Sequence, residues 1–290
     1  MNDKEQQYNF IHAYAKEYPI TKLVEIASVS RSGYYKWVKR QGENHQDLID
    51  ERIIPYIIKI FKDSRGTYGR KRIKIALENQ YDLIVNEKRI SRLMRKYGLV
   101  CRIRRKQYKS RVQPHGNIQN ILDQNFKALK PGLKYSIDIT YLEVKKGRQK
   151  WAYLCAIKDL FNHEIVAYSI GTSLELDLVF RALEQFKKVK FVKGAILHSD
   201  QGVQFTNFGY QKRIEKMGLT PSMSRRGNCW DNACIENFFG HLKTELPCWE
   251  KPQTLQEVIK AVENYIYNYN NKRIQTKLKM SPVEFREKAA

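Results

Sequence analysis

Three strand-like segments follow one another between residues 134 and 171, with only short polar stretches between them. The first covers 134–144 and ends at the turn-forming sequence 145–148, the second covers 151–157, and the third covers 164–171. All three are rich in β-branched and aromatic residues, which favour extended backbone. This run predicts that the second half of the chain is built around a β-sheet.

Helices and strands alternate after this run. Ser173 is a candidate N-cap for a helix whose apolar stripe reaches Phe186, and a buried-looking strand follows at 194–197. A helix at about 207–217 precedes a short strand at 219–223, where Pro221 restricts the strand to an edge or an end of the sheet. The order of these elements resembles a ribonuclease H-like α/β fold with a mixed five-stranded sheet. In that topology the first and fourth strands are neighbours.

The next helix, which follows a polar loop containing Arg225, Arg226 and Asn228, has a clear apolar stripe. Its apolar residues recur at helical spacing, and they are Ile235, Phe238, Phe239, Leu242 and Leu246. Asp231 is a candidate N-cap, because a carboxylate suits the positive end of a helix. Glu236 and Lys243 are two turns apart, so we expect them on one face.

Three acidic residues fall at related places in this arrangement. Asp138 lies in the middle of the first strand, Asp200 just after the fourth, and Glu236 on the helix after the fifth. Each of them alone is more often a cap or a surface charge. Three carboxylates in one cleft repel each other unless a cation lies between them. Oxygen ligands without His or Cys select magnesium or manganese, so we predict a site for two such ions.

Longer motifs resemble a known family. Asp138-Ile139-Thr140-Tyr141, His198-Ser199-Asp200-Gln201-Gly202, Gly227-Asn228-Cys229-Trp230-Asp231-Asn232-Ala233 and the segment 267–275 resemble bacterial insertion-sequence transposases of the three-family, second-reading-frame (OrfB) type. The 35 residues between Asp200 and Glu236 are similar to the spacing of the retroviral-integrase-like DDE core. Residues 47–110 resemble the family's upstream helix-turn-helix. Tyr135 stands where the family often has Trp.

The resemblance implies a DNA transposase that cleaves at mobile-element ends and joins the 3′-hydroxyl to target DNA, through a circular intermediate. Asp138 would hold both metal ions, and Asp200 and Glu236 one each. Lys243 would grip a DNA phosphate, although an ion pair with Glu236 or Asp231 is the simpler alternative. His198, Gln201 and Asn232 are candidates for supporting the site or touching DNA. Arg225, Arg226 and Asn228 of the polar loop are candidate DNA contacts. A homo-oligomer on DNA and a partner from an upstream reading frame are also implied.

Net charge supports a polyanionic partner. The formal charge is +23, which is the footprint of a nucleic-acid-binding protein. No apolar run is long enough to span a bilayer, and no signal peptide is expected, so the sequence predicts a cytoplasmic, nucleoid-associated protein. Two other functions stay open: a ribonuclease H-like nuclease of RNA–DNA hybrids, and a non-catalytic DNA-binding regulator.

The first half is helical in pattern. We divide the chain into an N-terminal helix-turn-helix-like region (1–45), a second helix-turn-helix domain (46–100), a basic linker (101–130), the catalytic domain (131–250) and a helical extension (251–290). The first region could equally be a plain helical bundle. In the second, Pro55 fits the first turn of a helix, Asn86 is a candidate N-cap, and Gly98 ends the last helix.

Basic residues concentrate around the linker. Residues 88–122 contain eleven Lys and Arg and no acid, which predicts an arm that follows DNA phosphates. The candidate DNA contacts in this half are Arg70, Lys71, Arg72, Lys88, Arg89, Arg92, Arg102, Arg104, Arg105, Lys106 and Lys109. The Tyr and Asn residues of 251–290 are interpreted as packing residues, with DNA contact as the alternative.

Overall fold

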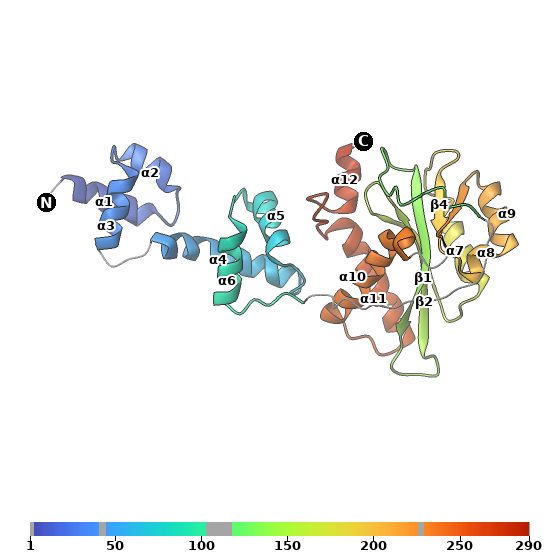
Figure 1. Cartoon of the computed structure of the whole chain (residues 1–290). Coiled ribbons are helices and arrows are strands. Elements are labelled where there is room, and N and C mark those ends of the chain that lie inside the picture. The colour runs from blue at the N-terminus through green and yellow to red at the C-terminus, as the bar shows by residue number, and fades with distance from the viewer. Residues whose placement is uncertain (1–2, 41–44, 103–117, 226–228, 290) are drawn as a thin grey trace. The chain divides into compact units, whose positions relative to one another are not determined.

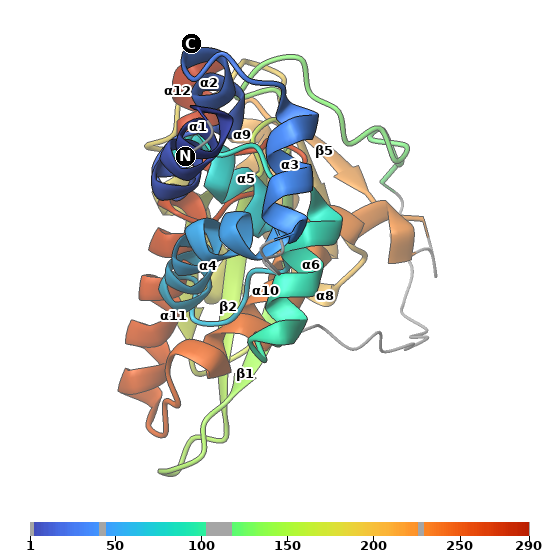
Figure 2. The same cartoon turned by 90° about the vertical axis from the view of Figure 1, so that its left-hand side faces the viewer.

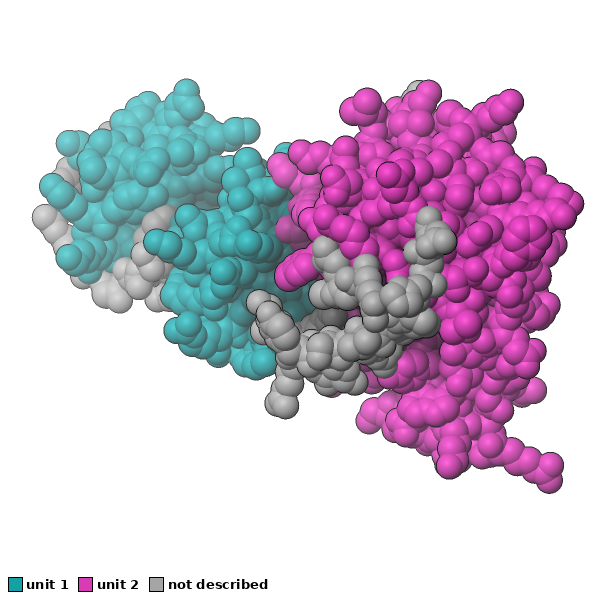
Figure 3. Space-filling model, turned by 45° about the vertical axis from the view of Figure 1, so that its right-hand side comes forward, with its two compact units in different colours: residues 1–101 teal, residues 102–290 magenta. Residues whose placement is uncertain are grey.

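The computed structural model describes residues 3–40, 45–102, 118–225 and 229–289. These residues form two compact units, Met1–Cys101 and Arg102–Ala290, which are coloured separately in Figure 3. Each unit has its own buried apolar residues, so each is described by itself.

The first unit begins with three short helices around a small core. They are α1 (Asp3–Tyr14), α2 (Ile20–Ile26) and α3 (Arg31–Arg40). Ile11, Leu23 and Tyr34 are buried between them. Ser30 caps α3, because its Oγ accepts a hydrogen bond from the Gly33 amide at 3.1 Å. These contacts make a helical bundle with a real core, on which the α3 aromatics pack.

Three further helices complete this unit: α4 (His45–Asp63), α5 (Arg70–Tyr81) and α6 (Glu87–Lys96). The Asn86 side chain accepts from the Lys88 amide at 2.8 Å, and Gly98 has φ 65°, so both predicted helix ends are confirmed. The prediction for Pro55 was wrong, because this residue lies in the interior of α4. The side chains of Ile54 and Ile57 on either side are buried, and this packing offsets the backbone hydrogen bond that proline removes.

The second unit is built on a five-stranded sheet. The strands are β1 (Lys134–Glu143), β2 (Trp151–Asp159), β3 (Ile165–Gly171), β4 (Ile196–Ser199) and β5 (Thr220–Met223). Their order is β3-β2-β1-β4-β5, with β1, β2 and β3 antiparallel and β4 parallel to both β1 and β5. This mixed sheet is the predicted ribonuclease H-like fold, and β1 and β4 are neighbours as expected.

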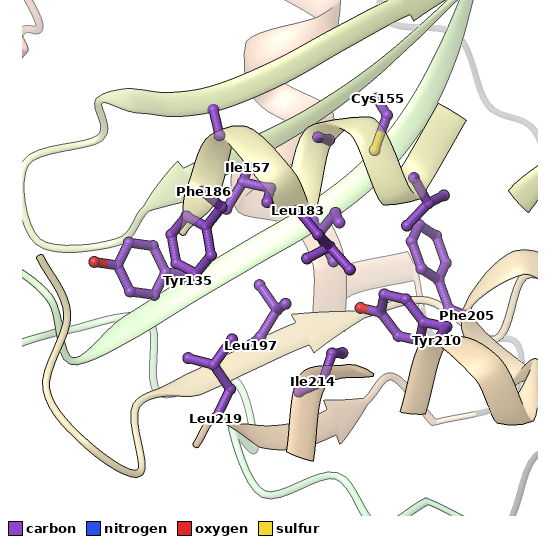
Figure 4. Packing of buried hydrophobic residues seen from close by; sticks show 14 of the residues in the cluster. Tyr135, Cys155, Ile157, Leu183, Phe186, Leu197, Phe205, Tyr210, Ile214 and Leu219 are labelled. Atoms are coloured by element: carbon purple, nitrogen blue, oxygen red, sulfur yellow. The ribbon is translucent and has the colours of Figure 1, made fainter. Parts of the chain in front are cut away.

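Helices cover both faces of the sheet (Figures 1 and 2). On one face, α7 (Leu176–Phe186) and α9 (Phe208–Lys216) enclose a core with Tyr135, Phe186 and Tyr210, which Figure 4 shows from close by. On the other face, α10 (Ala233–Trp249) and α11 (Leu255–Asn271) bury a second core, in which Phe238 packs against Tyr269. The chain ends with α12 (Pro282–Ala289). The sheet is therefore a middle layer, and α10 lies against the face that carries Leu142.

Some local predictions were wrong. Helix α7 begins at Leu176 with Glu175 at its N-cap, so Ser173 does not cap it. A short helix, α8 (Val203–Thr206), follows Gly202 in a stretch for which the sequence indicated no element. Within the part of the chain that the structure describes, no helix combines the length and apolar character needed to cross a membrane.

Candidate active site

Asp138 sits at the centre of the sheet. It pairs with Ala156 of β2 and is half-buried on the same face of β1 as Ser136 and Thr140, because alternate residues of a strand share a face. One carboxylate oxygen accepts a hydrogen bond from the Ile139 amide at 2.7 Å. The side chain is thus held beside its own strand, facing the layer that contains α10.

Asp200 comes next to Asp138 through strand register. Ser136 pairs with His198 in the parallel β1–β4 ladder, and two residues further along the chain lie Asp138 in β1 and Asp200 just after the end of β4. The Gly202 amide donates to the Asp200 carboxylate at 2.9 Å. A Cβ at position 202 would lie 2.9 Å from that oxygen, so a side chain here would displace the Asp200 carboxylate. The sequence predicted the position of Asp200 but not this turn.

Glu236 completes the group from the opposite layer. It lies in the first turn of α10 and is exposed, while the neighbouring Ile235 and Phe238 anchor the helix in the core. Burial raises the pKa of Asp138 well above its ordinary value, and the charges of Asp200 and Glu236 raise it further. The Ile139 amide and the Lys243 ammonium lower it. Asp138 therefore feels the charges of Asp200, Glu236 and Lys243.

Asp200 and Glu236 influence the pKa of Asp138, but the oxygens of these three described residues do not converge on one point as metal ligands do. Among the described residues, no three His, Cys, Asp or Glu side chains are placed so that they could hold one metal ion. The pKa of Asp200 is also raised by burial, against the Gly202 hydrogen bond. The raised pKa values mean that the charged forms of Asp138 and Asp200 are destabilised here. A bound cation would stabilise these charged forms.

Lys243 lies farther along α10. Its Nζ is 4.3 Å from the centroid of the Tyr141 ring, which is a cation–π contact. Tyr141 is three residues after Asp138 on β1, so this contact joins the strand of one carboxylate to the helix of another. The sequence placed Lys243 on the face of Glu236 but did not indicate its aromatic partner.

Asp231 does not cap α10, contrary to the sequence prediction. The helix begins at Ala233 after a 3-10 turn, and Asn232 occupies its N-cap. Asp231 is instead fully buried and accepts hydrogen bonds from the backbone and guanidinium of Arg225, from Asn120 and from Gln124, at 2.8–3.1 Å. Burial alone would raise its pKa, but the hydrogen bonds from Arg225 lower it to about 2. The carboxylate is therefore occupied by five hydrogen bonds from Arg225, Asn120 and Gln124 and does not cap the helix.

A buried polar network connects the elements that carry the acids. His198 is fully buried, with Nδ1 2.9 Å from Ser222 Oγ and Nε2 3.1 Å from Ser224 Oγ. Burial lowers the pKa of His198 to about 4, so its ring is neutral at pH 7. The Gln201 amide donates to the Ser224 carbonyl at 3.1 Å, and Ser136 Oγ contacts the Asn232 side chain. The serines were not identified from sequence, since nothing local distinguishes them from other strand residues.

The basic candidates of the first unit lie on α5 and α6. Arg70 is 3.4 Å from Glu87, and Arg89 and Arg92 approach the buried Asp50. Arg72 lies over the Tyr68 ring at 5.5 Å, whereas Lys71 and Lys88 are exposed. A hollow of about 790 Å³ is lined by Arg70, Lys74, Asn86, Glu87, Lys88, Ser91, Arg92 and Arg95. Arg102 is exposed and is the last residue of the described range 45–102. The candidates that fall outside the described residues are Arg104, Arg105, Lys106, Lys109, Arg226 and Asn228.

Comparisons with known proteins agree with this architecture. An integrase core domain matches residues 128–229, a second integrase core domain matches 236–289, and an HTH-like domain matches 49–107. The chain is 36% identical to the putative transposase InsK for insertion sequence element IS150 of Escherichia coli (strain K12), over 93% of this chain and 94% of that protein. It is 30% identical to transposase InsF for insertion sequence IS3A of the same strain, over 92% and 93% respectively.

One solved structure with similarity is a simian T-cell lymphotropic virus intasome in complex with PP2A regulatory subunit B56 gamma. It has a TM-score of 0.47 and 14% identity, and the match covers 79% of this chain and 74% of that chain.

The sheet order and the matched domains define an integrase core preceded by an HTH-like domain. The chain belongs to the bacterial insertion-sequence transposases, the family of the IS150 and IS3 proteins. It is thus a DNA-binding polynucleotidyl transferase of DNA transposition.

The Asp231 network gives a stability prediction. We expect Asp231→Ala to lower the free energy of unfolding by about 1–3 kcal/mol, because the amides of Asn120, Gln124 and Arg225 lose their buried acceptor. Asp123→Ala is the matched control, since Asp123 also approaches Arg225, at 3.7 Å, but its side chain is 78% exposed. Urea titration of both variants measures the difference. Equal midpoints would show that the network does not hold the loop.

Proposed function

We propose that this transposase cleaves DNA at the ends of a mobile element and joins the exposed 3′-hydroxyl to a target phosphodiester, with Asp138, Asp200 and Glu236 as its catalytic residues. The observation that carries the proposal is that the register of β1 and β4 places Asp138 next to Asp200, and that the charges of Asp200 and of Glu236 on α10 both raise the pKa of Asp138. Carboxylates that repel one another in a fold of this family are best explained by a cation that they share.

The donor set fits magnesium or manganese. The three residues offer carboxylate oxygens alone, and neither His nor Cys belongs to the set, so a hard divalent cation is preferred over zinc. Asp138 would contribute to both ions of a pair, and Asp200 and Glu236 to one each. When bound, such a pair supplies an activated attacking oxygen and charge compensation at the leaving oxygen of an in-line phosphoryl transfer.

The remaining residues would orient the DNA and hold the carboxylates in place. Lys243 offers a flexible point charge whose effect reaches Asp138, and such a charge suits a phosphate. His198 and Asn232 would keep β4, β5 and α10 in position through their buried serine contacts. The exposed Lys and Arg residues of α5 and α6, together with the Lys and Arg residues of the linker, would bind DNA phosphates farther from the reaction.

The direct test is joining of a labelled duplex, with the sequence of the element's end, to a plasmid. We expect products with magnesium and none when the metal is chelated. A matched RNA–DNA hybrid separates this function from a ribonuclease H-like nuclease, which would cut the hybrid without needing a specific end. Metal-independent joining, or none with any element end, would overturn the proposal.

Lys243 gives a second test of this site. We expect Lys243→Ala to slow end cleavage and joining by about one to two orders of magnitude, because a phosphate near the carboxylates loses its counter-charge. Lys243→Arg should recover much of the rate, since charge matters more than shape at a single phosphate. Single-turnover rates on pre-formed ends measure the effect. A lowered melting temperature with unchanged rates would instead make Lys243 a structural residue that packs on Tyr141.

A circular intermediate and a homo-oligomer that holds both element ends are part of this proposal. A partner encoded by an upstream reading frame stays a prediction from the sequence. Electrophoresis of reaction products on a donor plasmid would reveal the circle. Light scattering of the protein, with and without paired ends, would reveal the assembly.

A further inference from the structure

A pocket of about 340 Å³ lies beyond the carboxylates, between the far end of β1 and β2 and the end of α10. Its apolar lining consists of Tyr141, Leu142, Trp151, Leu246, Pro247, Pro252 and Val258, and its charged lining of Glu143, Lys145, Lys243, Glu250 and Lys251. Lys243 belongs both to this pocket and to the surroundings of Asp138, so the two sites are adjacent.

Two aromatic rings form the exposed wall of the pocket. Tyr141 and Trp151 stand edge to face, with ring centroids 5.1 Å apart, and they are 37% and 40% exposed. Large rings left this open are not core residues, and in a protein that acts on DNA they offer stacking surfaces for bases. The Lys243 ammonium over the Tyr141 ring places a cation at the edge of the same surface.

The pocket is preformed by backbone contacts. The amides of Lys145 and Lys146 donate to the Gln253 carbonyl at 3.0 and 2.9 Å, which fixes the β1–β2 hairpin, at the bottom of Figure 1, to the connection between α10 and α11. That connection is itself held by a capping box, in which Thr254 and Glu257 bond to each other's backbone. A rigid pocket loses little entropy when a flat ligand enters it.

The charges favour a nucleotide over an apolar ligand. Lys145 and Lys251 are exposed at the rim, together with Lys243. Of the two acidic residues, Glu143 is exposed and Glu250 accepts a hydrogen bond from Asn264 at 3.4 Å. A base on the aromatic wall would leave its phosphates among the three ammonium groups.

The spacing also suits one DNA strand. Tyr141 is three residues from Asp138 on a strand, and Lys243 is seven from Glu236 on a helix, so both separations are about 10 Å. At a rise of about 3.4 Å per nucleotide, this is roughly three nucleotides. We propose that the pocket binds an unpaired DNA base, stacked on Trp151 and in edge contact with the perpendicular Tyr141 ring, on a strand that passes through the active site. This inference rests on the proposed function.

Base-dependent binding tests the pocket without catalysis. The probes are two duplexes with an identical single-stranded tail, one of oligothymidine and one of abasic sugar-phosphate with the same charge. We expect the wild-type protein to bind the base-bearing tail at least about fivefold more tightly, as stacking on aromatic side chains predicts. The ratio should fall to about one in Trp151→Ala and Tyr141→Ala, and Trp151→Phe should restore much of it.

Phe208→Ala is the matched control, because Phe208 is 75% exposed under the Lys212 ammonium but does not line the pocket. It should keep the wild-type ratio. An unchanged ratio in the Trp151 and Tyr141 alanine variants, or equal weakening on both tails, would overturn the proposal. Lost self-association with an unchanged ratio would assign the pocket to a second copy of the chain. Wild-type joining in magnesium, measured alongside, shows whether the proposed function itself stands.

Discussion

Glu236→Gln is expected to abolish cleavage and joining in magnesium while DNA binding stays close to that of the wild type. The substitution removes one charge and keeps the shape of the side chain. Glu236 is exposed, and α10 is anchored by Ile235, Phe238 and Phe239, all of them buried, so the helix should stay in place. The loss would therefore come from the metal-binding charge and not from the fold.

The control for this variant is Glu215→Gln, which removes the same charge from an exposed residue of α9. Joining of pre-formed ends measures activity, and fluorescence anisotropy with the same duplex measures binding. Normal joining by Glu236→Gln would refute the three-carboxylate assignment. Loss of binding in parallel with activity would point to a role in holding DNA.

Arg273→Leu is expected to cause the largest loss of stability. Arg273 and Glu245 are 2% and 5% exposed, and the guanidinium donates to both carboxylate oxygens, at 2.8 and 2.7 Å. Tyr265 donates to the same carboxylate at 2.9 Å. Removing the arginine leaves a buried charge without its counter-ion, which costs about 3–5 kcal/mol of unfolding free energy. Because Glu245 is on α10, activity should fall as well.

The control is the exposed ion pair between Lys288 and Glu284, which are 2.9 Å apart. Lys288→Ala should change stability by less than about 0.5 kcal/mol, because water already solvates both charges. Urea titration of the full chain, followed at the unfolding transition of the second unit, compares the unfolding free energies of Arg273→Leu and Lys288→Ala. The double variant Glu245→Leu with Arg273→Leu should recover much of the loss. If Arg273→Leu is no less stable than Lys288→Ala, the buried pair does not hold α10.

The role of the Tyr and Asn residues in the C-terminal segment was decided by packing, not by the sequence motif. These residues formed a recognisable motif, but the sequence left open whether they pack or touch DNA. Tyr265 and Tyr269 are buried against Phe238, and Asn270 bonds to the backbone of Ile165 in β3. Tyr267 remains 61% exposed. Tyr265 and Tyr269 therefore pack on the helix that carries Glu236, and Asn270 ties the segment to the sheet.

The sequence by itself determined the order of strands and helices, the family, and the elements on which Asp138, Asp200 and Glu236 lie. These features are local, because strand and helix periods and short motifs are written in neighbouring residues. The tertiary structure alone decided the partners of buried polar groups. The sequence predicted Asp231 as a helix cap, yet it accepts a hydrogen bond from Asn120, which is 111 positions away in the chain. A buried carboxylate is stable only when it is hydrogen-bonded, so the donors that packing brings near it decide its role. Likewise, packing decided that Pro55 lies inside α4, and that Tyr141, Trp151 and Lys243 line one pocket.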